Sequence, residues 1–186
     1  MGSKKPMTRR QAKIALYKLA LARSDFFASR KAYEYMTKHV TGFDHPLYFH
    51  LYASSVIAYA KPFVDCALGV LPSQWSKFDV EWMREVHSDV IRARHEVIAH
   101  NDAKARKMWI IPPGAAPDDI IPASASGIVL KLETYYISGG LFDSLGQVCN
   151  YQIGRINKAI DEHLAALYDG QGLPAEAFLL TLDDAL

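Results

Sequence analysis

The chain contains little cysteine, little net charge and no long apolar run. Its two cysteines, Cys66 and Cys149, lie far apart among apolar neighbours, so buried free thiols in a reducing compartment are favoured over a disulfide. No stretch reaches the roughly 18 uncharged apolar residues that a membrane span needs. The composition, 50% hydrophobic with a formal net charge of +1, excludes global disorder. We expect a cytoplasmic globular protein of about one domain with no membrane partner.

Motifs for nucleophilic or metal-dependent catalysis are also missing. The chain has no Gly-x-Ser-x-Gly elbow and no glycine-rich phosphate loop. His95 and His100 flank a segment that resembles the HExxH zinc motif, but they lie five positions apart. That spacing is about 140° around a helix, so the two rings cannot chelate one zinc ion. His45 and His50 share this spacing and are better explained by a capped helix start. We expect no metal and no other cofactor.

The small net charge hides an uneven distribution of basic residues. Residues 1–38 contain ten Lys or Arg against Asp25 and Glu34, whereas the rest of the chain holds 11 basic and 18 acidic groups. Such a basic helix either attracts a polyanion or pairs with the acidic remainder of its own fold. For this feature alone, pairing within the fold or simple solvation is the favoured interpretation.

Periodicity and capping residues predict a mainly α fold, an antiparallel four-helix-type bundle with a small β-hairpin insertion before the last long helix. The hairpin is predicted from two β-rich stretches, Met108–Ile111 and Gly127–Ile137, with five prolines and glycines between them. One domain of residues 1–186 is expected, with a flexible N-terminus at 1–7, the insertion at 107–138 and a tail at 170–186. The four helices are expected from a Thr8–Gln11 capping box to about His39, from an Asp44 cap through a kink at Pro62, from Ser76 or Asp79 to about Asn101, and from near Gly140 to Tyr168.

The third predicted helix carries an apolar stripe with two polar members, His87 and Arg94. The stripe advances by three and four residues in turn through Val80, Met83, His87, Val90, Arg94 and Val97. Burying an unpaired guanidinium costs several kcal/mol. Arg94 therefore has an acidic partner inside the fold, or the stripe opens onto a cleft or a subunit interface.

Arg94 and His100 have the chemistry for RNA cleavage without a metal. Histidine transfers protons near neutral pH, and the guanidinium presents a planar set of donors to phosphate oxygens. On an ideal helix the two residues lie roughly 120° and 9 Å apart, so they converge only if the helix frays or a second copy completes the site. The alternative is a structural helix end, because cations stabilise helix C-termini.

The segment Ile91–Asp102 resembles the signature of the HEPN superfamily of α-helical bundles. Members carry an Arg, a polar residue and then a His a few positions later, near a helix end; here these are Arg94, His95 and His100. The upstream segment Tyr52–Phe63 resembles the preceding core helix of abortive-infection-like branches. The likeness covers about residues 46–105, and the β-insertion is not part of the core pattern.

This resemblance implies a homodimer with the motif at its interface and, in many members, metal-independent endoribonuclease activity. Such enzymes are often toxins with an antitoxin partner, or phage-defence elements. Arg94 would stabilise the phosphate in the transition state, and His100 would be the acid or base. Beside these two residues, we expect His95 and Asn101 to orient the substrate or the motif. Residues 92–107 carry five Lys or Arg against two acidic residues, so Arg92, Lys104, Arg106 and Lys107 are expected to contact the RNA backbone. The competing interpretation is a non-catalytic helical dimer that binds a nucleotide, RNA or a protein.

Overall fold

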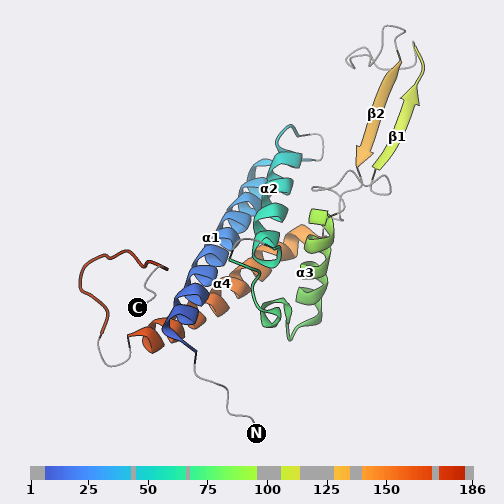
Figure 1. Ribbon diagram of the computed structural model, residues 1–186. Coiled ribbons are helices and arrows are strands. Elements are labelled where there is room, and N and C mark those ends of the chain that lie inside the picture. The colour runs from blue at the N-terminus through green and yellow to red at the C-terminus, as the bar shows by residue number, and fades with distance from the viewer. Residues whose placement is uncertain are drawn as a thin grey trace.

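The structure is a computed structural model. It describes residues 7–42, 45–65, 68–95, 106–113, 128–134, 140–168 and 172–182. The described chain is mainly helical, as the sequence predicts. Its elements in chain order are α1 (Arg9–His39), α2 (Tyr48–Ala60), the short 3-10 turns η1 (Lys61–Phe63) and η2 (Ser73–Ser76), α3 (Glu81–Ala93), β1 (Arg106–Ile111), β2 (Val129–Thr134) and α4 (Gly140–Leu167) (Figure 1).

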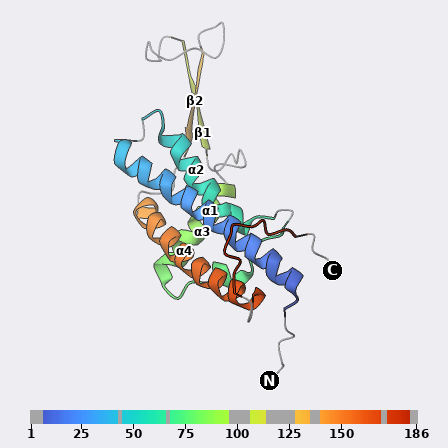
Figure 2. The same ribbon diagram turned by 90° about the vertical axis from the view of Figure 1, so that its left-hand side faces the viewer.

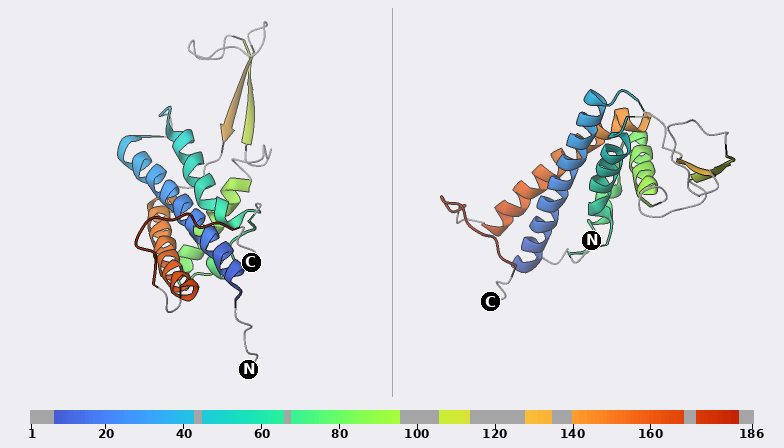
Figure 3. Two further views of the ribbon diagram at one scale, coloured as in Figure 1. Left: turned by 60° about the vertical axis from the view of Figure 1, so that its left-hand side comes forward. Right: turned by 90° about the horizontal axis from the view of Figure 1, so that it is seen from above.

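Helix α1 lies at the centre of the helical body. It packs against α4 on one side and α2 on the other, and α3 contacts both α2 and α4 (Figure 3). Helices α1 and α4 run in opposite directions. Arg23 and Arg30, seven residues apart on α1, donate to Asn157 and Asn150 on α4 at 2.6 and 2.7 Å. The large buried side chains between the helices include Phe26, Tyr52, Val56, Tyr59, Val90, Leu145, Val148 and Ile156.

The N-terminus of α1 has the predicted capping box. The Gln11 backbone N–H donates to Thr8 Oγ1 at 3.2 Å, and the Thr8 backbone N–H donates to Gln11 Oε1 at 2.9 Å. Each bond satisfies a backbone donor that the first turn of a helix leaves without an intrahelical acceptor.

Replacing Thr8 with alanine is expected to lower the free energy of unfolding by about 1 kcal/mol, because one of these bonds is lost. Urea titration monitored by circular dichroism measures the change. Thr37→Ala is the matched control, since Thr37 bonds only to carbonyls of its own helix and alanine has the higher helix propensity. Equal stability of the two variants would contradict the capping role.

Helix α2 differs from the prediction at both ends. Its N-cap residue is Leu47, with no side-chain cap, and Asp44 lies outside the described residues. The Leu47 backbone N–H instead donates to Nδ1 of His45 at 3.2 Å. Pro62 does not kink a continuing helix: α2 ends at Ala60, and Pro62 lies buried in the separate turn η1. Proline blocks the hydrogen bond that would extend the helix.

Helix α3 begins at Glu81, so the predicted starts at Ser76 and Asp79 are wrong. Ser76 belongs to the short turn η2, and a hydrogen bond from α4 holds this turn in place. Buried Gln152 donates from Nε2 to the backbone carbonyl of Trp75 at 2.8 Å. This bond satisfies a carbonyl in the short turn and holds the turn against α4. The predicted end near Asn101 lies outside the described residues.

Strands β1 and β2 follow α3 and precede α4 in the sequence. They pair antiparallel, with Arg106 opposite Thr134 and Ile111 opposite Val129. Both strands lie largely within the stretches predicted as strands, and Figure 1 shows them projecting away from the helices. Near the other end of the body, residues 172–182 pass along α1 (Figure 2). There Tyr17 donates from its hydroxyl to the Leu180 carbonyl at 2.9 Å. No described helix is long and apolar enough to cross a membrane.

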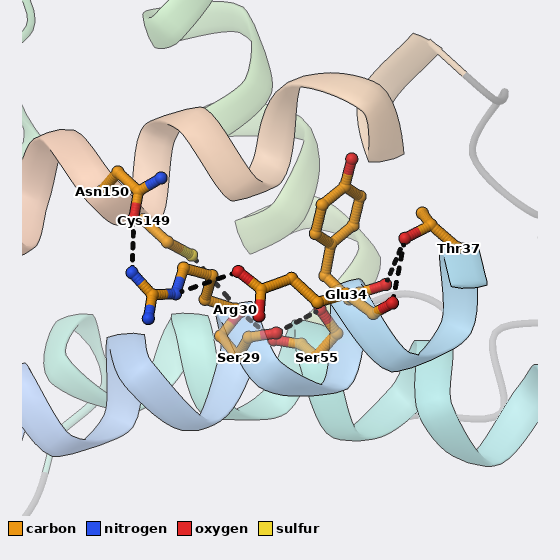
Figure 4. A network of polar contacts seen from close by, with 8 residues as sticks. Ser29, Arg30, Glu34, Thr37, Ser55, Cys149 and Asn150 are labelled. Atoms are coloured by element: carbon orange, nitrogen blue, oxygen red, sulfur yellow. Dashed lines mark hydrogen bonds and ion pairs between the residues drawn. The ribbon is translucent and has the colours of Figure 1, made fainter. Parts of the chain in front are cut away.

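Small polar residues fix the crossing of α1 and α2 (Figure 4). Ser29 and Ser55 are fully buried, and each hydroxyl donates to the other residue's backbone carbonyl, at 2.8 and 3.2 Å. Cys149 on α4 donates from Sγ to Ser29 Oγ at 3.6 Å. Burial raises the pKa of this thiol to about 12, so Cys149 is a protonated, unreactive free thiol, as predicted. Cys66 lies outside the described residues.

Candidate functional site

The apolar stripe that carries His87 and Arg94 on α3 leaves the core at Arg94. Val90 and Ala93 are fully buried, and Arg94 follows them as the half-buried C-cap residue. Its backbone N–H donates to the carbonyls of Val90 and Ile91, so the last turn stays helical up to this residue. The core contacts of α3 thus hold the backbone of Arg94 in place while part of its side chain remains accessible.

Arg94 lines a cleft of about 370 Å³ that α1, α2 and the residues after η1 enclose. A cleft at Arg94 is one of the alternatives that the sequence leaves open for the apolar stripe, beside an acidic partner and a subunit interface. The cleft also contains Asp25 and Asp65, but Asp25 already pairs with a lysine: Lys61 Nζ lies 3.3 Å from Asp25 Oδ1.

Three cationic side chains line this cleft, against two carboxylates. Lys18 Nζ donates to the Val70 carbonyl at 3.4 Å, and Arg94 Nη1 lies 3.2 Å from His95 Nδ1. These contacts are with a backbone carbonyl and an imidazole nitrogen, so neither brings a negative charge to Lys18 or Arg94, and Asp65 is the one carboxylate of the lining left to offset them. The cleft therefore carries an excess of positive charge that favours an anionic ligand.

Apolar side chains form much of the remaining lining. Leu21 of α1 is 51% exposed and Ile57 of α2 is 41% exposed, and both border the cleft. The sequence pattern groups Leu21 with Ile14 and Tyr17 on one face of α1. The buried face is instead formed by Leu16, Leu19, Ala22 and Phe26. Exposed aliphatic groups beside cations suit a ligand with both a charged and an apolar part.

The structure brings together two of the six predicted site residues, Arg94 and His95. His95 is exposed and directly follows Arg94 in the chain. Arg92 is exposed and forms an ion pair with Asp89 on the same helix, and it does not line the cleft. His100, Asn101 and Lys104 lie outside the described residues.

His87, the other polar member of the stripe, belongs to the core. It is 9% exposed, and its Nδ1 lies 3.1 Å from the hydroxyl of Tyr59. The rings of Phe63 and Phe78 pack against the imidazole, with centroids 4.6 and 5.4 Å away. Burial lowers the pKa of His87 to about 4, so the ring is neutral at pH 7. His87 stabilises the packing of α2 against α3.

The rest of the described surface offers no metal centre. Among the described residues, no group of three His, Cys, Asp or Glu side chains is close enough to hold a metal ion. Of the three tryptophans, Trp75 is buried in the core, Trp82 is half-buried against it, and Trp109 on β1 is 52% exposed.

Sequence reasoning missed Lys18 and Lys61 as members of the site. One signal was present, because Lys18, Leu21 and Asp25 are spaced so that they share one face of α1. That spacing shows a mixed face but not what lies opposite it. The contribution of Lys61 depends on the packing of α2 against α1.

Comparison of the chain with protein-family models, curated proteins and solved structures finds no significant match. Its function is therefore inferred from its own residues and their geometry.

Proposed function

We propose that the protein is a HEPN-like helical domain that forms a homodimer and cleaves RNA without a metal. In this proposal the four helices form the bundle and the β1–β2 hairpin is an insertion in it. The observation that carries the proposal is the position of Arg94. A core helix holds it in a cleft with an excess of positive charge, where a phosphate of RNA would be stabilised.

The proposed reaction is an attack of a ribose 2′-hydroxyl on the adjacent phosphorus. The O2′–P bond forms, the P–O5′ bond breaks, and the products carry a 2′,3′-cyclic phosphate and a 5′-hydroxyl. His100 acts as the acid or base, and Arg94 stabilises the charge on the phosphoryl oxygens. His95 and Asn101 orient the substrate, and Arg92 and Lys104 contact the RNA backbone.

A second candidate is a helical dimer that binds a nucleotide, RNA or a protein without chemistry. The apolar lining of the cleft favours this alternative, since Leu21 and Ile57 supply contact area but no reactive group. In the presence of a chelator, the nuclease is expected to cleave RNA, whereas the binding protein is expected to leave RNA intact.

Incubation of the purified protein with total RNA and with a tRNA pool in EDTA tests the proposal. We expect cleavage products with 2′,3′-cyclic phosphate ends, which 3′-end chemistry or mass spectrometry identifies. A His100→Ala variant with unchanged circular dichroism is expected to lose the activity. An intact dimer that cleaves neither RNA pool would overturn the nuclease proposal in favour of the binding function.

A further inference from the structure

The β1–β2 hairpin is an isolated two-stranded ribbon among the described elements. It projects away from the helices (Figure 1), and neither strand packs closely against a described helix. Three consecutive residues of β1 are largely exposed: Met108 by 61%, Trp109 by 52% and Ile110 by 64%. A two-stranded ribbon is only marginally stable in water, and further strands or a packed apolar face stabilise it. The hairpin therefore has the character of an interaction surface.

The pairing register places the apolar positions of both strands on one face of the ribbon. Met108 lies opposite Leu132, and Ile110 lies opposite Leu130. Alternate residues of a strand share a face, so these four positions form a single apolar face. A partner that extends this face by adding strands at the edge of the ribbon would stabilise it.

The sequence of β2 is complementary in charge to a second copy of itself. Lys131 and Glu133 flank Leu132 at the middle of the strand. If two copies of β2 pair antiparallel about a two-fold axis at Leu132, each Lys131 lies directly opposite the partner's Glu133. Opposite charges in such cross-strand pairs are stabilising, and the two-fold axis makes each contact occur twice. We infer that β2 pairs in this way with β2 of a second copy, so that two hairpins form one four-stranded antiparallel sheet.

Strand β1 is the outer strand of this sheet. It ends at Ile111 and is followed by Pro112 and Pro113. Proline has no backbone N–H to donate to a neighbouring strand, and it is typical of edge strands. Pairing of β1 with itself would also bring no opposite charges together, because the strand contains Arg106 and Lys107 but no acidic residue.

The proposed sheet lies apart from the Arg94 cleft, since no residue of either strand lines that cleft. The inference rests on the proposed function only in that both involve a homodimer, and it does not require RNA cleavage. It assigns a role to the insertion that lies outside the core pattern of the helical bundle.

Reversal of one charge at a time tests the pairing. Lys131→Glu places a glutamate opposite the partner's Glu133, and Glu133→Lys places a lysine opposite the partner's Lys131. Each variant alone is expected to dimerise at least about tenfold more weakly than wild type, because like charges then face each other twice. A one-to-one mixture of the two variants brings opposite charges together again and is expected to restore the dimer. Sedimentation velocity over a range of concentrations measures the dissociation constant.

The mixture also controls for effects within one chain. Glu133 lies opposite Lys107 in the hairpin, so Glu133→Lys weakens the hairpin itself. Mixing leaves this contact unchanged, and recovery of the dimer therefore reports on the contact between copies. Lys158→Glu makes the same charge reversal at an exposed lysine of α4 and is expected to dimerise like wild type.

A cysteine at the two-fold axis provides a direct test of the register. In a Cys66→Ser background, Leu132→Cys places two thiols on directly opposite residues, whose Cα atoms lie about 4.5–5.5 Å apart. This distance permits a disulfide, so mild oxidation is expected to give a covalent dimer on a non-reducing gel. Ile110→Cys on β1 is the matched control. Three strand spacings separate the two outer strands, about 14 Å, so this variant is expected to remain uncrosslinked.

The outcomes separate this inference from the nuclease proposal. Failure of the mixture to recover the dimer, or a crosslink at position 110 without one at position 132, would show that the assignment of β2 is wrong. RNA cleavage by the wild-type protein in that case would leave the nuclease proposal standing. Recovery in the mixture and a crosslink at position 132, together with no RNA cleavage, would support the sheet and overturn the nuclease.

Discussion

Replacing Arg94 with alanine is expected to lower the rate of RNA cleavage by about 10²- to 10³-fold, the usual cost of losing one donor to a charged transition state. The helical content should not change. Arg94 follows the buried residues Val90 and Ala93, which keep the end of α3 in the core without help from the guanidinium. Single-turnover cleavage in EDTA measures the rate, and circular dichroism checks the fold.

Arg84→Ala is the matched control for this experiment. Arg84 lies on the same helix and pairs on the surface with Glu81, and it has no role in the proposed site. We expect the wild-type rate, because loss of a surface ion pair outside the reaction centre does not change the chemical step.

The structural interpretation of Arg94 makes the opposite prediction. If the guanidinium only holds the subunits together, Arg94→Ala weakens the dimer, because an interface hydrogen-bond network loses a member. Sedimentation velocity over a range of concentrations would then show dissociation. An intact dimer with wild-type cleavage would contradict both roles.

The sequence predicts the long helices α1 and α4 well because local signals define them. Thr8 and Gln11 cap α1 within one turn, and the apolar residues Leu145, Val148 and Ile156 of α4 are buried as their spacing predicts. Such signals depend on residues within a few positions of one another. They can be recognised in the sequence without knowledge of the tertiary structure.

The start of α3 could not be predicted from the local sequence, because contacts distant in sequence hold the turn that precedes it. The bond from Gln152 to the Trp75 carbonyl joins residues 77 positions apart and fixes the turn before α3. Arg155 adds to it, donating to the Gln74 carbonyl at 2.9 Å. No property of Ser76 or Asp79 alone shows that this turn is held against α4.

The residues of the candidate site also divide into those that a local sequence signal marks and those that only tertiary packing brings to the cleft. Arg94 stands out in the sequence because a guanidinium interrupts an apolar stripe, which predicts a cleft or an interface at that position. Lys18 and Lys61 do not stand out, since basic residues are common on exposed helix faces. Their role depends on how α1 and α2 pack, and the reciprocal bonds between Ser29 and Ser55 belong to that packing.

Acid is expected to destabilise the fold through His87. In the folded protein, burial lowers the pKa of this imidazole to about 4, whereas the unfolded chain has the ordinary value of 6.5. Between pH 6.5 and pH 4 the unfolded state therefore binds a proton that the folded state does not. Stability is present in full above pH 6.5 and falls as the pH decreases through this window.

The expected loss at pH 4 is about 2 kcal/mol, less than the full conversion of the pKa difference because the ring edge keeps some contact with solvent. The groups that face the imidazole are the Tyr59 hydroxyl and the rings of Phe63 and Phe78. None of them carries a negative charge that would stabilise the protonated ring, since burial raises the pKa of Tyr59 well above its ordinary value.

Urea titrations at pH 7 and at pH 4 in wild type, His87→Gln and His50→Gln measure this contribution. Glutamine at position 87 lowers stability at both pH values, because it fills the aromatic pocket less well, but it should remove most of the difference between them. His50 is exposed on α2, so His50→Gln should retain the wild-type difference. A pH difference that His87→Gln leaves intact would mean that other groups cause the acid sensitivity. The neutral, buried His87 would then not be its origin.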